Sequence, residues 1–324
     1  MNVSSGEETR VDRGSLPPIG GRVKAFAAAV SLVVAFPVAS WLAGCMGKPL
    51  GVAELDFIVL SDVEAACDPE RDSVQYFPGV AAAVREAGQG DFLVAVGDIS
   101  PARELDRMIR AAMGDGYPWY FVVGNHDVKE KHLSWLKSRA ETLPGVVRRG
   151  PRNSEETTYS FDHKGVHFVV INQYYSGLSD DEDWSDICPS LYDWLEQDLA
   201  GNSGKRIFVF GHEPVASIPD ADNGLVTHEE TNLSRHEKNA YRFWRLLRDK
   251  GVTAYVCGHT DTFSWAKFNG VWQINAGHAR GPLQDDTSST FLRFLVRDDA
   301  CSVQVFRSEG DAGNFRLRQT IVLD

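Results

Sequence analysis

Short apolar segments that end at an Asp, Asn or His recur along this chain. Segments of this length, rich in β-branched and aromatic residues, are typical of strands buried on both faces of a sheet. Between them, apolar residues recur at helical spacing, and an alternation of strands and helices indicates an α/β fold. The expected strands cover 55–60, 92–96, 119–123, 166–171, 207–210 and 253–256. The expected helices cover 78–87, 102–113, 190–199 and 234–247.

The chain changes character after residue 290. The segments FLRFLV and VQVFR alternate apolar and polar residues there. Such alternation is typical of antiparallel strands with one buried face. We expect these strands to complete a second sheet.

The polar residues at the strand ends carry the functional information. Ligands of α/β sheets bind beyond the carboxyl ends of the strands, and a glycine before a ligand lets the backbone approach closely. One such residue is normally a cap or a loop residue, but five segments of this kind indicate a common site. The five are Asp62, Gly97-Asp98, Gly124-Asn125-His126-Asp127, Gly211-His212 and Gly258-His259.

This ordered set resembles the pattern of the calcineurin-like metallophosphoesterases, which share a core with purple acid phosphatases. That pattern runs Asp-x-His, Gly-Asp-x-x-Asp, Gly-Asn-His-Asp or Glu, Gly-His, and Gly-His-x-His. The match spans residue 55 to about residue 277, and Gly-Asn-His-Asp at 124–127 is its most specific element. The resemblance implies two mixed β-sheets packed as a sandwich and flanked by helices, in four layers. It also implies a dinuclear metal site that hydrolyses a phosphomonoester or a phosphodiester.

The resemblance further implies a role for each matching residue. Asp98 would bridge two metal ions. One of these ions would also bind Asn125, His212 and His259. The other ion would bind Asp62 together with two histidines of the family's pattern.

Three positions depart from that pattern. Glu64 and Asp261 stand where the family has the two histidines, and Pro101 replaces the second acid of Gly-Asp-x-x-Asp. Carboxylates around one ion favour a harder metal such as Mg²⁺ or Mn²⁺, whereas imidazoles suit Zn²⁺ or Fe. We therefore expect two divalent or trivalent ions, a harder one beside the carboxylates and a transition metal beside the histidines. The alternative is that Glu64 and Asp261 point away and leave their position weak or empty.

The expected mechanism follows from the two ions and their neighbours. Two cations about 3.5–4 Å apart clamp a phosphoryl group and activate a water for in-line attack. His126 matches the family's histidine that protonates the leaving oxygen or steadies the transition state. Asp127 would orient the His126 ring. His278 is a further candidate for contact with substrate, and Arg280 for contact with a phosphate oxygen.

The first 45 residues have the order of a secretory signal. Basic residues precede an apolar run at 25–43, which closes with Leu42-Ala43-Gly44-Cys45. These four residues resemble the lipobox of bacterial lipoproteins, in which the cysteine is acylated. An uncleaved transmembrane anchor is the alternative, since about 20 apolar residues can span a bilayer. Either interpretation places a single metallophosphoesterase domain, 46–324, outside the cytoplasm and at a membrane, in the periplasm or on the cell surface.

The four remaining cysteines leave two interpretations open. In an oxidising compartment they could form two disulfides, in any of three pairings. Each could equally be a small hydrophobic residue of the core. They are Cys67, Cys188, Cys257 and Cys301.

The formal net charge of −12 argues against nucleic-acid binding, because phosphate backbones are bound by Lys and Arg. A metal ion can still supply positive charge locally for a small-molecule phosphoester. Nothing in the sequence predicts a protein partner. A chain that has kept the fold but lost one metal and its catalysis would instead be a binding module. A hydrolase with a side-chain nucleophile is poorly supported, because the sequence holds no Gly-x-Ser-x-Gly motif.

Overall fold

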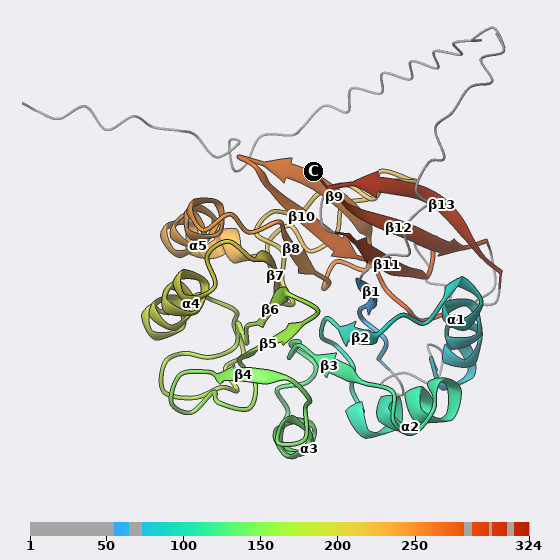
Figure 1. Cartoon of the computed structure of the whole chain (residues 1–324), viewed down its shortest axis with the longest axis horizontal. Helices are drawn as coiled ribbons and strands as arrows, with labels where there is room; N and C mark the ends of the chain where they lie inside the picture. Colours follow the sequence, from blue (N-terminus) through green and yellow to red (C-terminus); the bar gives the residue numbers. More distant parts are fainter. Residues whose placement is uncertain (1–54, 65–72, 282–286, 298–299, 310–313, 324) are drawn as a thin grey trace, which may run out of the picture. The chain divides into compact units, whose positions relative to one another are not determined.

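Two β-sheets, one of six strands and one of seven, form the centre of the fold (Figure 1). The structure is a computed structural model that describes residues 55–64, 73–281, 287–297, 300–309 and 314–323. These residues belong to one unit, Ala53–Asp324. The expected signal segment with Cys45, and also Cys67, lie outside the described residues.

The six-stranded sheet has the order β13-β12-β11-β1-β2-β3. Strands β1, β2 and β3 run parallel, and β11 pairs antiparallel with β1. The strands from the end of the chain therefore extend the sheet of β1, and the expectation that they complete a second sheet is wrong. The free edge of β1 is the physical reason, since Phe294 of β11 stacks there on Phe57 of β1 with ring centroids 4.6 Å apart. The strand bounds are β1 Leu55–Leu60, β2 Phe92–Ala95, β3 Trp119–Phe121, β11 Thr290–Val296, β12 Cys301–Ser308 and β13 Phe315–Val322.

The seven-stranded sheet has the order β4-β5-β6-β7-β8-β10-β9. Its strands β6, β7, β8 and β10 run parallel, while β4, β5 and β9 are antiparallel to their neighbours. Both sheets are therefore mixed, as expected. The strand bounds are β4 Val146–Arg149, β5 Tyr159–His163, β6 Val166–Val170, β7 Arg206–Phe210, β8 Ala254–Cys257, β9 Phe263–Phe268 and β10 Val271–Ala276.

Aromatic side chains join the two sheets face to face. Phe57 of β1 meets Phe168 of β6 edge-on, with ring centroids 5.3 Å apart, and Phe208 of β7 at 5.5 Å. These side chains are fully buried. A strand covered on both faces cannot alternate apolar and polar residues, which explains the continuous apolar runs of β1, β2 and β7. The expected sandwich of two mixed sheets is confirmed.

Helices flank both sheets (Figure 1). Helix α3 packs on the six-stranded sheet, where Trp135 stacks on Trp119 of β3, and α5 packs on the other sheet through Trp244 and Tyr255 of β8. In the described ranges, no helix is both long enough and apolar enough to cross a membrane. The helix bounds are α1 Ser73–Ala87, α2 Ala102–Met113, α3 Glu130–Ala140, α4 Pro189–Gly201, the 3-10 helix η2 Leu233–His236 and α5 Glu237–Asp249.

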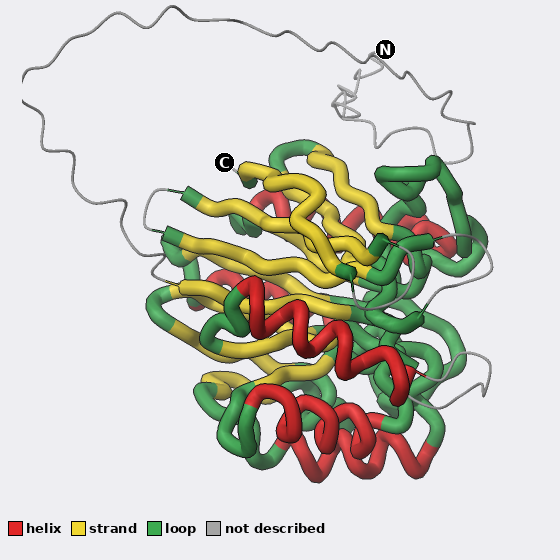
Figure 2. The backbone as a smooth tube through the Cα atoms, turned by 90° about the vertical axis from the view of Figure 1, so that its right-hand side faces the viewer, coloured by secondary structure: helices red, strands yellow, loops and turns green. Residues whose placement is uncertain are grey.

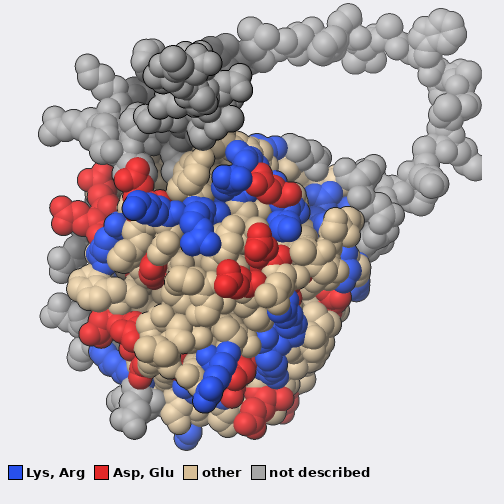
Figure 3. Space-filling model, turned by 90° about the vertical axis from the view of Figure 1, so that its left-hand side faces the viewer, with Lys and Arg blue, Asp and Glu red and all other residues tan. Residues whose placement is uncertain are grey.

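The arrangement of the strands positions the candidate site. Parallel strands of both sheets end at one edge, and many of the loops gather at one end of the strands (Figure 2). Basic and acidic side chains are interspersed on the described part of the face that carries α4 and α5 (Figure 3). The cysteines Cys188, Cys257 and Cys301 are buried. Those three therefore act as small core residues.

Candidate metal centre

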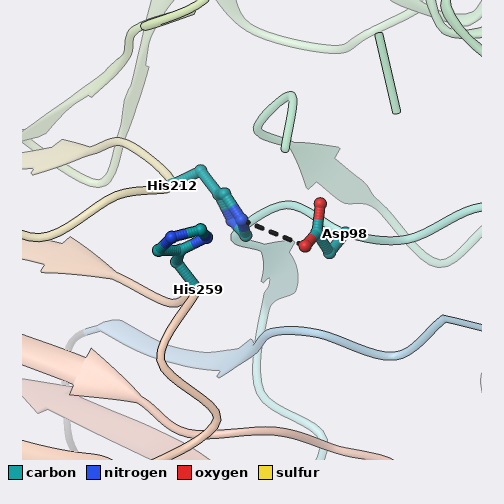
Figure 4. Close-up of side chains that lie close together, drawn as sticks. All are labelled: Asp98, His212 and His259. Atoms are coloured by element: carbon teal, nitrogen blue, oxygen red, sulfur yellow. Dashed lines mark ion pairs between the residues drawn. The ribbon is translucent and has the colours of Figure 1, made fainter. Parts of the chain in front are cut away.

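Four loops bring four potential metal ligands together at the strand ends. Asp98 follows β2, Asn125 follows β3, His212 follows β7 and His259 follows β8. Asn125 Oδ1 lies 3.1 Å from His212 Nε2 and 3.1 Å from His259 Nδ1. Asp98 Oδ2 lies 3.2 Å from His212 Nε2. Figure 4 shows the Asp98 carboxylate and the two rings turned toward one another.

These spacings fit a single ion. Ligand atoms about 2.1 Å from one metal are roughly 3.0–3.4 Å apart in octahedral or tetrahedral geometry. The ligand atoms of Asp98, His212 and His259 lie within 4.8 Å of one another, and all three residues are buried. One carboxylate, one amide oxygen and two imidazoles form a mixed oxygen and nitrogen set that suits a transition metal. The residues at this position therefore fit the metal that the family's pattern implies.

Hydrogen bonds fix which nitrogen of each histidine faces this position. His212 Nδ1 lies 2.8 Å from the carbonyl oxygen of Val96 and donates to it, which leaves Nε2 for the ion. His259 Nε2 lies 2.9 Å from Thr231 Oγ1, which leaves Nδ1 for the ion. Partners of this kind, on the nitrogen remote from the metal, orient ligating histidines in metalloproteins.

The pKa values of the three titratable ligands are shifted by burial and by one another's charges. Burial disfavours the charged form of Asp98, but the His212 charge outweighs it and holds the pKa of Asp98 at about 2. Burial likewise disfavours the charged form of His212, yet Asp98 raises the His212 pKa to about 10. Burial and the nearby charges of His212 and His228 lower the pKa of His259 to about 3. The proton on His212 Nε2 therefore stands where a metal ion would bind, and binding of the ion displaces that proton.

Backbone strain is concentrated in the same loops. Nine non-glycine residues of the described chain have positive φ, and five of them belong to the candidate site. Such conformations cost about 1–3 kcal/mol each and persist where the surroundings enforce them. Their clustering indicates that the loops are held in place for function. The five are Asp62, Glu64, Asp98, His259 and Asp261.

Glycines beside the ligands permit the close approach that their sequence positions predict. A Cβ on Gly124 would lie 2.2 Å from Asp98 Oδ1 and 2.3 Å from the Asp98 backbone nitrogen. A Cβ on Gly258 would lie 2.5 Å from Asp62 Oδ2. No side chain larger than hydrogen fits at these positions unless the ligand loops move.

We expect Gly124→Ala to weaken metal binding, because the added methyl group displaces Asp98. Disturbing the support of a metal ligand typically lowers affinity by about 10–100-fold, and overpacking costs about 1–3 kcal/mol of stability. Equilibrium dialysis with elemental analysis measures the first effect and thermal unfolding the second. The matched control is Gly116→Ala, because a Cβ there meets nothing within 4 Å. Equal affinities in the two variants would contradict the role assigned to Gly124.

The residues expected to hold a second ion have other partners. The Arg280 guanidinium forms ion pairs with Glu64 through Nη1 and with Asp261 through Nη2. Asp62 Oδ2 accepts hydrogen bonds from Ser61 Oγ at 2.5 Å and from the His259 backbone nitrogen at 2.9 Å. Glu64 and Asp261 thus point into the site, but toward a guanidinium. Glu64, Asp98 and His126 present their ligand atoms within 4.8 Å of one another and so could also hold an ion. Arg280, however, already binds the Glu64 carboxylate.

His126 and Asp127 have separate environments. The His126 ring is 42% exposed, and its Nε2 lies 3.4 Å from Glu64 Oε1 and 4.0 Å from Asp98 Oδ2. Asp127 is fully buried, and its carboxylate accepts hydrogen bonds from the backbone nitrogens of Ile99 at 3.0 Å and Gly124 at 2.9 Å. Burial and the charge of Asp98 raise its pKa to about 6.

The structure therefore differs from the expected role of Asp127. Among the described contacts, Glu64 and not Asp127 faces the His126 ring. Asp127 instead accepts a 2.7 Å hydrogen bond from Ser100 Oγ and joins the loop after β2 to the loop after β3. The difference arises because the carboxylate accepts hydrogen bonds from the backbone nitrogen of Gly124, in its own turn, and from that of Ile99, in the loop after β2.

Several positioning residues were not found from the sequence. Gln173 Oε1 accepts hydrogen bonds at 2.7 Å from the backbone nitrogens of both His212 and Glu213. Asn275 Nδ2 donates to Thr260 Oγ1 at 2.8 Å and so steadies the loop that carries His259. Both are buried amides, Gln173 after β6 and Asn275 near the end of β10, and no motif marks them. The position of Asn275 after an apolar run was the available signal.

Of the two substrate candidates, only Arg280 reaches the carboxylates of the site. His278 is fully buried, and its Nε2 lies 3.2 Å from the carbonyl oxygen of Thr287. His278 Nδ1 accepts from the Arg280 backbone nitrogen at 3.4 Å. His278 therefore supports the segment that presents Arg280.

Comparisons with known proteins place this fold. A family model described as calcineurin-like phosphoesterase matches residues 55–262. The structure is similar to GAP50, described as the anchor in the inner membrane complex of Plasmodium, with a TM-score of 0.53 and 15% identity over 83% of this chain and 88% of that one. It is also similar to PhoD, with a TM-score of 0.53 and 10% identity over 82% of this chain and 71% of that one. At such identities the structural matches show the fold alone. No curated protein matches the chain in sequence.

Proposed function

Since the chain belongs to the calcineurin-like phosphoesterase family, we propose that it hydrolyses phosphate esters with the help of a metal ion. The ligands of that ion are Asp98, Asn125, His212 and His259. One observation carries the proposal: four side chains from loops of two sheets form a chain of neighbouring ligand atoms, Asp98 to His212 to Asn125 to His259, with successive distances of 3.2, 3.1 and 3.1 Å. Substrates of this class are phosphomonoesters or phosphodiesters.

A divalent ion in this position supplies a Lewis acid that polarises phosphoryl oxygens and lowers the pKa of a water. The protein's own residues do the rest. His126 lies at the solvent-accessible side of Asp98, with its Nε2 3.4 Å from Glu64 Oε1. Glu64 holds the imidazole ring with one nitrogen toward the site. From there His126 donates a proton to the leaving oxygen as the phosphorus–oxygen bond breaks.

The direct test is a panel of phosphoesters with defined metals. The full-length protein is stripped with a chelator, reloaded with Mn²⁺, Fe, Zn²⁺ or Mg²⁺, and assayed on p-nitrophenyl phosphate and bis-p-nitrophenyl phosphate. We expect activity that requires metal and is lost again on chelation. The absence of hydrolysis of both substrates with every metal would contradict the proposed function.

A second candidate function is that of a binding module without catalysis. The observation in its favour is that Arg280, and not a metal, faces Glu64 and Asp261. The similar GAP50 is itself described as an anchor. An inactive protein that still binds metal in the panel would favour this function.

The location of the protein is part of the proposal. The lipobox-like sequence Leu42-Ala43-Gly44-Cys45 supports export and attachment to a membrane through an acylated Cys45. Mass spectrometry of membrane extracts should find diacylglycerol on Cys45. An intact Met1 would favour the uncleaved anchor instead.

A further inference from the structure

Arg280 occupies the part of the site where the family's pattern calls for a second metal ion. It lies four residues beyond the end of β10, and its side chain is only 4% exposed. Its guanidinium contacts Glu64, from the loop after β1, and Asp261, from the loop after β8. Arg280 therefore joins the loops that follow β1, β8 and β10.

The two carboxylates that it binds are two of the three departures from the family's pattern, and they stand where that pattern has histidines. A histidine at either position would ligate a metal through a neutral ring, and a guanidinium would repel the metal beside it. Carboxylates at both positions instead match a planar cation with several N–H donors. The two acids and the buried arginine between them therefore form one chemically matched set.

The energetics favour the guanidinium over an ion. Arginine stays protonated at every accessible pH, so its charge cannot be removed to admit a metal. An ion that displaced it from Glu64 and Asp261 would separate a buried cation from both of its carboxylates, which is strongly unfavourable.

We propose that Arg280 permanently takes the place of the second cation, so that this phosphoesterase works with one metal ion and one guanidinium. The inference rests on the proposed function for the role of the first ion, but it concerns the occupancy of the second position. The single positive charge of Arg280 partly neutralises Glu64 and Asp261 and keeps a cation beside the metal position at all metal concentrations. Glu64 in turn links Arg280 to His126, since its Oε1 lies 3.4 Å from His126 Nε2.

The experiment counts bound ions and needs no activity. Full-length protein is dialysed against excess Mn²⁺, and the metal content is measured by elemental analysis. We expect about one Mn²⁺ per chain in the wild type and about two in Arg280→Met, because that variant frees Glu64 and Asp261 for a hard ion. The matched control is Arg293→Met, which removes an arginine paired with Asp56 outside the site and should leave the count at about one.

A second measurement can be made on the wild type alone and then extended to the variants. Two Mn²⁺ ions about 3.5–4 Å apart couple magnetically, whereas a single ion gives an isolated signal in electron paramagnetic resonance. The wild type should show the isolated signal and Arg280→Met the coupled one. Adding Glu64→Gln and Asp261→Asn to Arg280→Met should restore the isolated signal.

The outcomes separate this inference from the proposed function. A coupled pair in the wild type, or no additional ion in folded Arg280→Met, overturns the inference and leaves the proposed hydrolysis standing. One ion in the wild type without hydrolysis of any substrate overturns the proposed function and supports the inference. If the wild type binds no ion, a gain of one ion in Arg280→Met still supports the inference, and no gain overturns it.

Discussion

Replacing His212 by alanine is expected to remove the metal ion and abolish hydrolysis. His212 Nε2 lies between Asp98 Oδ2 and Asn125 Oδ1, at 3.2 and 3.1 Å, so its loss opens the middle of the ligand set. A metal ion contributes several kcal/mol to the stabilisation of the transition state, and kcat/KM should therefore fall on the order of 10³-fold or more. Elemental analysis and steady-state kinetics measure the two effects.

A matched control separates metal loss from general damage. His163→Ala removes a partly exposed histidine of β5 outside the site and should leave both the metal content and kcat/KM unchanged. The loss of His212 also leaves Asp98 buried without its closest positive partner, so circular dichroism must show that the variant is folded. A folded His212→Ala protein that keeps its ion and its activity would contradict the assignment of His212 as a metal ligand.

Replacing His126 by alanine should lower turnover by about 10²–10⁴-fold without emptying the metal position. The reason is that the His126 ring lies beside the ligands but is itself 42% exposed, and its Nε2 faces Glu64 rather than the metal position. If the imidazole protonates the leaving oxygen, the deficit depends on the leaving group. Esters of alkyl alcohols should suffer more than p-nitrophenyl esters, because p-nitrophenolate leaves without a proton.

The comparison of leaving groups decides between two roles for His126. Equal deficits for alkyl and p-nitrophenyl esters would mean that the imidazole steadies the phosphoryl group and does not act as an acid. The control is Asp127→Asn, which weakens the hydrogen bonds between the loops after β2 and β3. We expect that change to lower the thermal stability and to reduce turnover on both kinds of ester alike.

The sequence predicted most of the fold that surrounds the site. The runs at 55–60 and 102–113 match β1 and α2 in their bounds. In both segments the pattern of apolar residues is regular, and it stops where the element ends. Strands β4, β5 and β9 and helix α3 were not predicted. Their sequences mix buried and exposed residues without clear periodicity, and the order of strands in a sheet depends on contacts that no local pattern records.

Asp98, Asn125, His212 and His259 could be predicted because each repeats one local arrangement, a buried strand followed by a polar residue. The residues that contact those ligands could not be predicted in this way. Arg280 reaches Glu64 across 216 positions of sequence, and Thr231 reaches His259 across 28. No pattern of neighbouring residues in the sequence indicates either contact. For the same reason the sequence could not show that Asp127 accepts hydrogen bonds from the backbone nitrogens of Gly124 and Ile99. Its place in the motif had suggested contact with the His126 ring instead.

The pairing of β1 with β11 determines when the site can form as the chain is synthesised. Asp56 of β1 is bound by Arg293 of β11, which lies 237 positions later. Contacts this distant close slowly, and β1 cannot gain its second neighbour until the ribosome has released the segment that ends at Val296. The loop after β1 therefore settles among the last parts of the molecule. A nascent chain that has already produced Asp98, Asn125, His212 and His259 still lacks the strand that supports β1, and with it the loop that carries Glu64.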